Sequence, residues 1–392
     1  MKSLFEEASN LFPQIQQLRR DLHRHPELGF EEHRTAGIVA RELRTLGLEV
    51  STGIGKTGVV GLLEGAHEGP TLLLRFDMDA LPIQEETGAE YASTRPGVMH
   101  ACGHDGHVAI GLTVAKLLAQ HRDEIHGRVK FVFQPAEEGL GGAQAMLEDG
   151  VLESPRPDFS LALHLWNEKP VGWVAATPGP FMAGSDVVDI NLRGRGGHGA
   201  LPHHTRDPIV AAAQLILALQ TIVARNVPPL DVAVLSITQV HGGDAHNVIP
   251  ETVHLRGTLR TFSKSTRELV LNRIFQLTDH LAHAMGCDGE VKITDLTPPV
   301  VNDETVTMLV AQTAREVLPE VIVDTSYRTM VSEDMALLME RVPGCYFMVG
   351  SANPERGLNY GHHHPKFDFD EQALVYGATL MSAVALKRLG AP

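Results

Sequence analysis

A nine-residue stretch at positions 99–107, MHACGHDGH, gathers five side chains that can bind a metal ion: His100, Cys102, His104, Asp105 and His107. Thiolate and imidazole are preferred ligands of zinc-like ions. Cys102 and His104 are separated by one glycine, a spacing that favours a tight loop turning both side chains toward one point. The stretch therefore predicts a metal site. The alternative is a polar loop around a buried free cysteine.

A second stretch, QPAEEG at positions 134–139, contains the adjacent residues Glu137 and Glu138. Two neighbouring glutamates cannot point the same way from one backbone, so one can ligate a metal while the other faces an open coordination position. A metal-bound water needs a nearby base to take its proton, and a carboxylate can do so. The alternative is a solvated acidic turn.

Three further groups are candidates by residue type and position. His164 follows a mostly apolar strand and, taken alone, is more typical of a buried core histidine. The run His362–His364 has little packing rationale in a loop. Asp77 and Asp79 follow a buried strand and lie on one side of it. They could ligate a metal, hold the second N–H of a ligand histidine, or cap a turn.

Composition excludes several classes of function. The 392 residues carry a net charge of −15, which argues against nucleic acid as a partner. Hydrophobic residues make up 43% and charged residues 21%, as in a soluble globular protein, and the length favours two domains. Three scattered cysteines favour a reducing, cytoplasmic location. We expect neither a signal peptide nor a membrane partner, since no stretch approaches the ~20 apolar residues that span a bilayer.

The first and last parts of the chain alternate helices with apolar strands. This predicts an α/β fold in which polar residues at the carboxyl ends of strands form the ligand-binding edge of a mixed sheet flanked by helices. The predicted helices cover residues 11–25, 31–46, 108–120 and 371–388, and the predicted strands cover 59–63, 72–76, 129–133, 159–163 and 346–349.

The middle of the chain has a different order of elements. Predicted strands at 187–192, 232–240, 252–261 and 290–294 alternate with helices at 207–224 and 265–285 in the order βαββαβ, which is that of ferredoxin-like folds. We therefore expect residues 185–298 to form an inserted domain. Residues 1–184 and 299–392 then form one discontinuous catalytic, metal-binding domain.

Eight stretches together resemble the aminoacylase and carboxypeptidase family of dinuclear metallohydrolases: DMDALP, HACGHDGH, QPAEEG, LHLW, GRGGHGALPHHTRDP, HGGDAHNVIPE, RGTLRTF and HHPKFDFDE. They are most similar to the branch of hippurate hydrolase, N-acyl-amino-acid amidohydrolase and auxin-conjugate hydrolase. The resemblance covers nearly the whole chain in the order of the family. The Cys-x-His pair is specific to that branch, whereas relatives outside it use a histidine and an aspartate from separate segments.

The resemblance implies roles for individual residues of the catalytic domain. Glu137 resembles the general base, and Asp79 resembles the aspartate that holds a ligand histidine. The choice among the three adjacent histidines rests on the distance to the following proline, so His362 and His364 stay open as alternatives to His363. The residues that resemble metal ligands are Cys102, His104, Glu138, His164 and His363.

The resemblance also implies that the inserted domain is a lid through which two chains dimerise. His198 resembles the histidine that reaches the active site of the neighbouring subunit, and surrounding glycines would allow a close approach. Asn247 and Arg260 resemble residues that hold the carboxylate or oxyanion of the substrate. The alternatives are an exposed loop histidine, a turn-capping asparagine and a solvated strand arginine. We expect a homodimer or a dimer-based homotetramer.

The implied reaction is metal-dependent hydrolysis of the amide bond of N-acyl-L-amino acids, with an acetyl, benzoyl or similar acyl group. Two divalent ions per chain are expected, and a mixed sulfur, nitrogen and oxygen ligand set suits zinc, manganese, cobalt or nickel. An N-acetyl-diaminopimelate deacetylase and a dipeptidase are alternatives within this class. An inactive metal- or amino-acid-binding protein on the same scaffold is an alternative from another class, and Glu137 beside a full ligand set argues against it.

Overall fold

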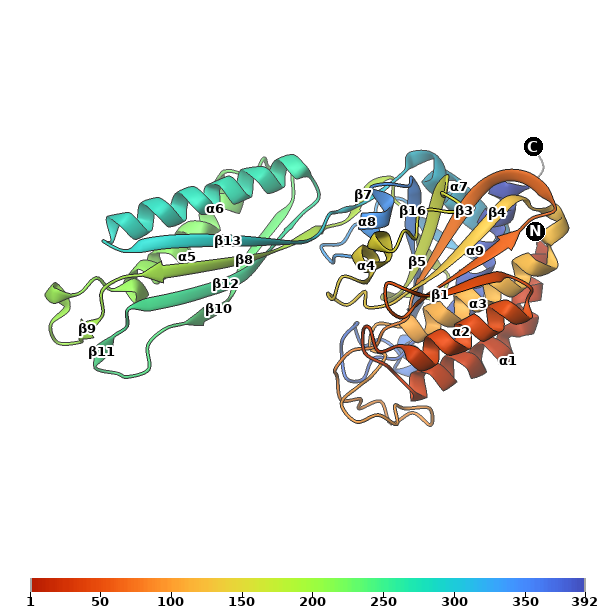
Figure 1. Cartoon of the computed structure of the whole chain (residues 1–392), viewed down its shortest axis with the longest axis horizontal. Helices are drawn as coiled ribbons and strands as arrows, with labels where there is room; N and C mark the ends of the chain where they lie inside the picture. The colour runs from red at the N-terminus through yellow and green to blue at the C-terminus, as the bar shows by residue number, and fades with distance from the viewer. Residues whose placement is uncertain (1, 391–392) are drawn as a thin grey trace. The chain divides into compact units, whose positions relative to one another are not determined.

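The computed structural model describes residues 2–390 and divides into two compact units. Unit 1 comprises Met1–Phe181, Val301–Arg328 and Asp334–Pro392, and unit 2 comprises Met182–Val300 and Thr329–Glu333. Unit 1 is therefore discontinuous in sequence, with most of unit 2 inserted between its first and second segments (Figure 1).

Unit 1 is built on an eight-stranded mixed sheet, which confirms the α/β prediction. Its strand order is β1-β2-β4-β3-β5-β16-β6-β15. The central strands β4, β3, β5 and β16 are parallel, whereas β1 and β2 form an antiparallel edge. The strands are β1 (Glu49–Ile54), β2 (Gly58–Glu64), β3 (His67–Asp77), β4 (His126–Gln134), β5 (Phe159–Pro170), β6 (Trp173–Ala175), β15 (Ile322–Asp324) and β16 (Gly344–Ala352).

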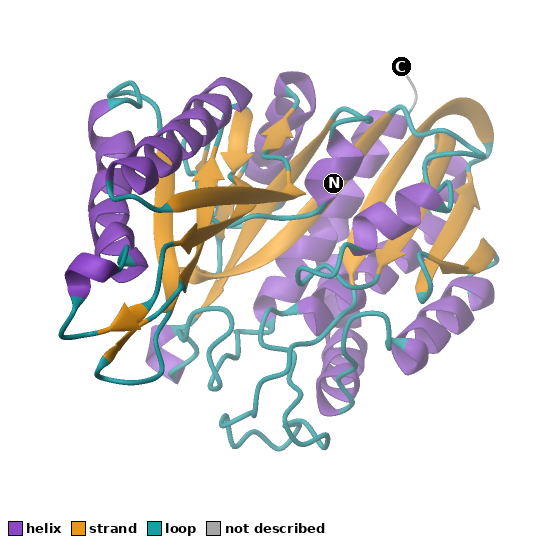
Figure 2. Ribbon diagram, turned by 60° about the vertical axis from the view of Figure 1, so that its left-hand side comes forward, coloured by secondary structure: helices purple, strands orange, loops and turns teal. Residues whose placement is uncertain are grey.

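Helices flank this sheet and bury its apolar strands (Figure 2). Helices α3 and α9 pack on the sheet and on each other, and both are apolar on nearly every side, as expected for helices inside a core. Helix α1 covers both of them. The helices of unit 1 are α1 (Lys2–Arg24), α2 (His33–Thr45), α3 (His104–Gln120), α4 (Gly142–Glu148), α7 (Glu304–Val317), α8 (Met335–Met339) and α9 (Gln372–Leu389).

Unit 2 contains a four-stranded antiparallel sheet in the order β10-β12-β8-β13, with α5 and α6 packed on it. Its chain order is the predicted βαββαβ. In β8, Val188, Ile190 and Leu192 are buried and belong to the apolar core of this unit, while the residues between them are more exposed. The elements are β8 (Gly184–Arg193), α5 (Pro208–Arg225), β10 (Ala233–His241), β12 (Thr252–Thr261), α6 (Lys264–Ala284) and β13 (Asp288–Thr297).

Two small ribbons complete the fold. Strand β9 (Gly197–His198) pairs with β11 (Val248–Ile249) inside unit 2. Strand β7 (Gly179–Met182) pairs with β14 (Val300–Asn302), where the chain passes from one unit to the other.

Helix α5 differs from the expectation that no stretch of the chain is long and apolar enough to span a bilayer. Its 18 residues make it long and apolar enough, by length and composition, to cross a membrane. One face of α5 instead packs into the core of unit 2, through Ala211, Ala212, Leu215, Leu219 and Ile222. The large apolar side chains of α5 that are exposed belong to Ile209, Val210 and Leu217.

Candidate metal centre

The carboxyl ends of the parallel strands gather the predicted residues of unit 1. Strand β3 ends at Asp77, beside the end of β4, and the loop after β4 carries Glu137 and Glu138. His164 lies on β5 just beyond the part of that strand that pairs with β3. The predicted strand of residues 159–163, with His164 just after it, is too short, because β5 continues along β16 to Pro170.

Helix α3 begins at His104, four residues earlier than predicted. Gly103 has a φ of 90°, a left-handed conformation that lets the chain turn from the loop into the helix at little steric cost. Cys102 therefore lies at the end of the loop and His104 in the first helical turn. His107 follows one turn later, with its ring 5.4 Å from the ring of His104.

All five predicted ligands occur in overlapping groups of potential metal-binding side chains. Within each group, the donor atoms lie within 4.8 Å of one another. Overlapping groups of this kind could hold two ions that share ligands. Three of these groups are Cys102 with His104 and His164, Cys102 with Glu138 and His363, and His104 with Glu137 and Glu138, and a further group places His104 with Asp77 and His107.

The ring nitrogens of the buried histidines fit metal binding. The Nδ1 of His104 lies 2.9 Å from the backbone oxygen of Asp79 and 3.2 Å from its carboxylate. Its Nε2 is buried and has no hydrogen-bond partner among residues 2–390, which is costly unless a ligand occupies it. The Nδ1 of His164 lies 2.7 Å from the oxygen of Leu165, and its Nε2 lies 3.5 Å from the sulfur of Cys102. Ligand histidines commonly hold their second nitrogen in this way.

The three adjacent histidines point to different surroundings. The Nε2 of His363 lies 3.1 Å from a carboxylate oxygen of Glu138. His362 stacks on Trp166 and hydrogen-bonds a backbone oxygen, while the Nδ1 of His364 accepts the N–H of the residue two positions later. The geometry therefore brings His363, rather than either neighbour, into the cluster.

The backbone of His363 is held in an unusual conformation. Its φ of 66° lies in the left-handed region, which is uncommon for a residue with a Cβ. Its N–H donates to the oxygen of Ala101 at 2.8 Å, so the histidine loop is tied to the loop that carries Cys102. Such local strain is typical of functional sites.

Carboxylates make the site attractive to a cation. Burial raises the pKa of the Cys102 thiol well above its usual value, and the neighbouring Glu138 raises it further. Burial opposes the charged form of His104, but Asp77 and Asp79 outweigh it and raise its pKa to about 10. A bound divalent ion would reverse both preferences, because a coordinating thiol or imidazole gives up its proton.

We expect metal binding to remove the proton of Cys102, because the raised pKa keeps this thiol protonated in metal-free protein at neutral pH. At neutral pH, adding zinc to metal-free protein should release protons. At an alkaline pH, where the metal-free thiol begins to ionise, bound zinc should protect Cys102 from alkylation by iodoacetamide. Peptide mass spectrometry can measure the labelling, with the buried Cys287 and Cys345 as internal controls. Equal labelling of Cys102 with and without metal would contradict its role as a ligand.

Asp77 and His107 form a buried arrangement to which the sequence analysis assigned no fixed role. The Nδ1 of His107 lies 2.5 Å from Asp77, and its Nε2 accepts the N–H of Leu165 at 3.0 Å. Although burial opposes it, the nearby histidines and Arg75 hold the pKa of Asp77 well below its usual value. His107 therefore supports the backbone next to the candidate ligand in β5. Its spacing of three residues from His104 on one helix was the available signal.

Asp79 connects two parts of the cluster. Besides contacting His104, its carboxylate accepts the N–H of Glu138 at 3.0 Å. Glu137 is half-buried, and one of its carboxylate oxygens lies within 4.8 Å of the donor atoms of His104 and Glu138. Asp79 thus contacts both the candidate ligand His104 and the backbone N–H of Glu138, in the loop that carries the candidate base Glu137.

The predicted residues of unit 2 fall into two places. His198 is exposed on β9, where it pairs with Val248. The N–H of Gly199 donates to the oxygen of Asn247 at 2.8 Å, so His198 and Asn247 are neighbours.

Arg260 does not join them within the chain. It lies near the opposite end of β12 from Thr252, beside Ser185 of β8. Arg260 lies eight residue steps along the strand from Thr252, which corresponds to roughly 26 Å at ~3.3 Å per residue. Burial lowers the pKa of Arg260, and its guanidinium contacts Thr258.

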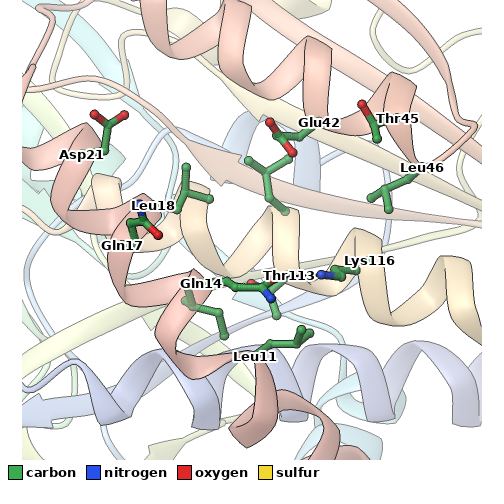
Figure 3. Close-up of a pocket in the computed structure, with 12 residues that line it drawn as sticks. Leu11, Gln14, Gln17, Leu18, Asp21, Glu42, Thr45, Leu46, Thr113 and Lys116 are labelled. Carbon is green, nitrogen blue, oxygen red and sulfur yellow. Dashed lines mark hydrogen bonds between the residues drawn. The ribbon is translucent and has the colours of Figure 1, made fainter.

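A groove of about 490 Å³ between α1, α2 and α3 contains none of the candidate ligands (Figure 3). Leu11, Leu18 and Leu46 line its apolar part, and Lys116 and Glu42 are among its polar residues. These residues form no group that could hold a metal ion. The chemistry predicted from the sequence therefore lies at the sheet edge rather than in this groove.

Comparisons with known proteins agree with the cluster. The chain is 41% identical to N-acetyl-L-cysteine deacetylase of Bacillus subtilis, over 94% of this chain and 86% of that protein. It is 37% identical to IAA-amino acid hydrolase ILR1-like 2 of Arabidopsis thaliana, over 98% of this chain and 87% of that protein.

A solved structure and a family model extend the similarity to the whole fold. The crystal structure of a dinuclear metal-binding peptidase of the M20 family from Bacillus subtilis matches with a TM-score of 0.85 and 35% identity, over 97% of this chain and 99% of that one. The model of peptidase family M20/M25/M40 matches residues 73–387. The chain belongs to this family of metallopeptidases and amidohydrolases.

Proposed function

We propose that the protein is a metal-dependent amidohydrolase that converts N-acyl-L-amino acids into a carboxylic acid and a free amino acid. The observation that carries this proposal is the buried Nε2 of His104, which has no hydrogen-bond partner among the described residues and belongs to a mixed sulfur, nitrogen and oxygen donor set beside Glu137. Relatives named as a deacetylase of N-acetyl-L-cysteine and a hydrolase of indole-acetyl amino acids support this substrate class.

Five residues would hold two divalent ions, of which zinc or manganese is our first choice and cobalt or nickel would also suit the donors. When bound, such ions polarise a substrate carbonyl and make a water molecule more acidic. Asp79 would keep His104 in the tautomer that presents Nε2. The proposed ligands are Cys102, His104, Glu138, His164 and His363.

Glu137 would serve as base and then as acid. Its carboxylate takes one proton from water as the water oxygen bonds to the amide carbon. The same proton is then delivered to the amide nitrogen, so that the carbon–nitrogen bond breaks and a free amine leaves. One residue can perform both transfers, because it returns the proton that it took.

Unit 2 would be a ferredoxin-like lid and dimerisation domain, corresponding to residues 185–298, and the rest of the chain the catalytic domain. Arg260 and Thr252 are separated by roughly 26 Å along β12, so one small substrate cannot contact both ends of the strand. This separation supports different roles for the residues at the two ends. We propose that Arg260 serves the substrate of its own chain and that His198 and Asn247 serve that of a neighbouring chain. The exposed large apolar residues of α5 support a homodimer or dimer-based homotetramer. The three free cysteines support a reducing, cytoplasmic setting.

A substrate panel tests the proposal. Metal-replete protein should release amino acids from N-acetyl-cysteine, N-acetyl-methionine or hippurate faster than from dipeptides or N-acetyl-diaminopimelate. Treatment with a strong chelator should abolish turnover, and added zinc or manganese should restore it. Full activity with less than one metal ion per chain by elemental analysis would contradict the proposal. So would metal binding without turnover of any substrate, which would favour a binding protein.

A further inference from the structure

Glu32 is a buried carboxylate that contacts the loop of the proposed base from another part of the chain. Its side chain is fully buried, and one oxygen accepts the N–H of Ala136 at 2.9 Å. The other oxygen accepts the hydroxyl of Thr57 at 2.5 Å. Ala136 directly precedes Glu137, although Glu32 lies 104 residues away in sequence.

Capping of its own helix does not explain Glu32. It occupies the N-cap position of α2, where a side chain commonly accepts an N–H of the first turn, yet it makes no such bond. The carboxylate of Glu27 does this instead, accepting the N–H groups of Arg34 and Thr35 at 2.9 and 2.8 Å. Glu32 is therefore free to reach the loop after β4.

Ala136 needs such support because its backbone is strained. Its φ of 52° lies in the left-handed region, which disfavours residues with a Cβ. Ala136 is fully buried, so an N–H without an acceptor there would cost free energy. The oxygen of Ala136 accepts the N–H of Gly142, which closes the loop on itself.

Two turns of the chain pack closely on this loop. A Cβ added to Gly29 would lie 3.0 Å from the Cα and Cβ of Ala136, so the turn before α2 is in tight contact with it. A Cβ added to Gly58, next to Thr57 in the second turn, would lie 3.1 Å from the Cδ of Pro135 in the loop. The Nζ of Lys56 lies 3.7 Å from the ring centre of Phe30 and joins the two turns. The surroundings of Glu32 are therefore well packed.

Two carboxylates bracket Glu137. Glu32 accepts the N–H of the residue before it, and Asp79 accepts the N–H of the residue after it. We propose that Glu32 is a positioning residue for this reaction, which fixes the backbone from which Glu137 reaches the substrate. This inference rests on the proposed role of Glu137 as the base. The carboxylate oxygens of Glu32 accept hydrogen bonds from Thr57 and from the backbone of Ala136, so Glu32 acts through Ala136 rather than on the substrate itself.

The test compares two substitutions of similar size in the full-length, metal-replete protein. Glu32→Gln keeps an oxygen for Ala136 and should retain most of the wild-type kcat. Glu32→Leu removes both acceptors and should lower kcat by about 10²-fold, as expected for a ~1 Å displacement of a catalytic group. KM and metal content should stay unchanged. Glu31→Leu is the matched control, because Glu31 is the exposed neighbour.

A double-substitution cycle separates positioning from general stability. Combined with Glu137→Gln, Glu32→Leu should lower kcat little further, because the group that it positions is already absent. The inference would be overturned if Glu32→Leu lowered kcat by the same factor in the wild-type protein and in the Glu137→Gln variant. It would also be overturned if Glu32→Leu had the wild-type kcat while Glu137→Gln was inactive. An active Glu137→Gln would instead refute the proposed base itself.

A second variant covers the case in which Glu32→Leu does not fold. Thr57→Val removes one hydrogen bond that orients the Glu32 carboxylate and leaves the one to Ala136. It should lower kcat less than Glu32→Leu, again with unchanged KM and metal content, and Glu32→Gln should again retain activity. If Thr57→Val has the wild-type kcat and Glu32→Gln loses as much activity as Glu137→Gln, the inference is wrong.

Discussion

Glu137→Gln should lower kcat by roughly 10²–10⁴-fold while the protein keeps its metal. The amide has nearly the shape of the carboxylate but cannot take a proton from water, so the loss concerns the chemical step. Glu137 lies within 4.8 Å of the donor atoms of His104 and Glu138, which is close enough to act on a water between them. Steady-state kinetics and elemental analysis on the same preparation measure both quantities.

Glu138→Gln provides the matched control, because it makes the same chemical change one residue later. Since Glu138 lies beside His363 and Cys102, we expect this variant to lose metal affinity, and excess metal to restore part of its activity. An exchange of the two phenotypes would mean that the base and the ligand are assigned the wrong way round. An active Glu137→Gln would exclude Glu137 as the base.

His198→Ala should lower kcat by about 10²–10³-fold, the effect of removing one group that stabilises a developing oxyanion. Metal content should not change, because His198 belongs to unit 2 and none of the candidate ligands does. His203→Ala is the matched control, since His203 is another exposed histidine of the same loop. A wild-type kcat for His198→Ala would leave it as an ordinary surface histidine.

Mixing two inactive variants tests whether His198 acts on a neighbouring chain. In a heterodimer of Glu137→Gln and His198→Ala chains, action in trans leaves one site without either residue and one site intact. Random exchange of equal amounts should therefore restore about a quarter of all sites, because half of the dimers are mixed. If His198 acts within its own chain, mixing restores nothing. A protein that is monomeric and fully active would also exclude the idea.

The types of chemical group and the order of elements were predictable from the sequence. Cys102 and His104 are separated only by Gly103, and Glu137 and Glu138 are adjacent, so local chain geometry alone limits where their side chains can go. The βαββαβ order of unit 2 was equally accessible, because strand and helix periods are local patterns. Strand β12 has the predicted bounds of Thr252 and Thr261.

Some elements were missed for identifiable reasons. Strand β1 is an edge strand whose residues are all exposed or half-exposed, so it lacks the apolar alternation that indicates a strand. The start of helix α7 was indicated in the sequence by Asp303, a residue type common at the N-cap of helices. In the structure, Asp303 caps this helix by accepting the N–H of Val306 at 2.9 Å. The start of α3 at His104 depended on the left-handed conformation of Gly103.

Only the tertiary structure decided which groups meet. Among three adjacent histidines, it brings His363 to Glu138, 225 residues away in sequence, and turns His362 toward Trp166. It also places the ring nitrogens of His107 against Asp77 and the N–H of Leu165. In the same way it brings the carboxylate of Glu32 to the N–H of Ala136. The physical reason is that local patterns determine periods and turns, whereas the partner of a buried polar group depends on which distant segments the packed core brings alongside it.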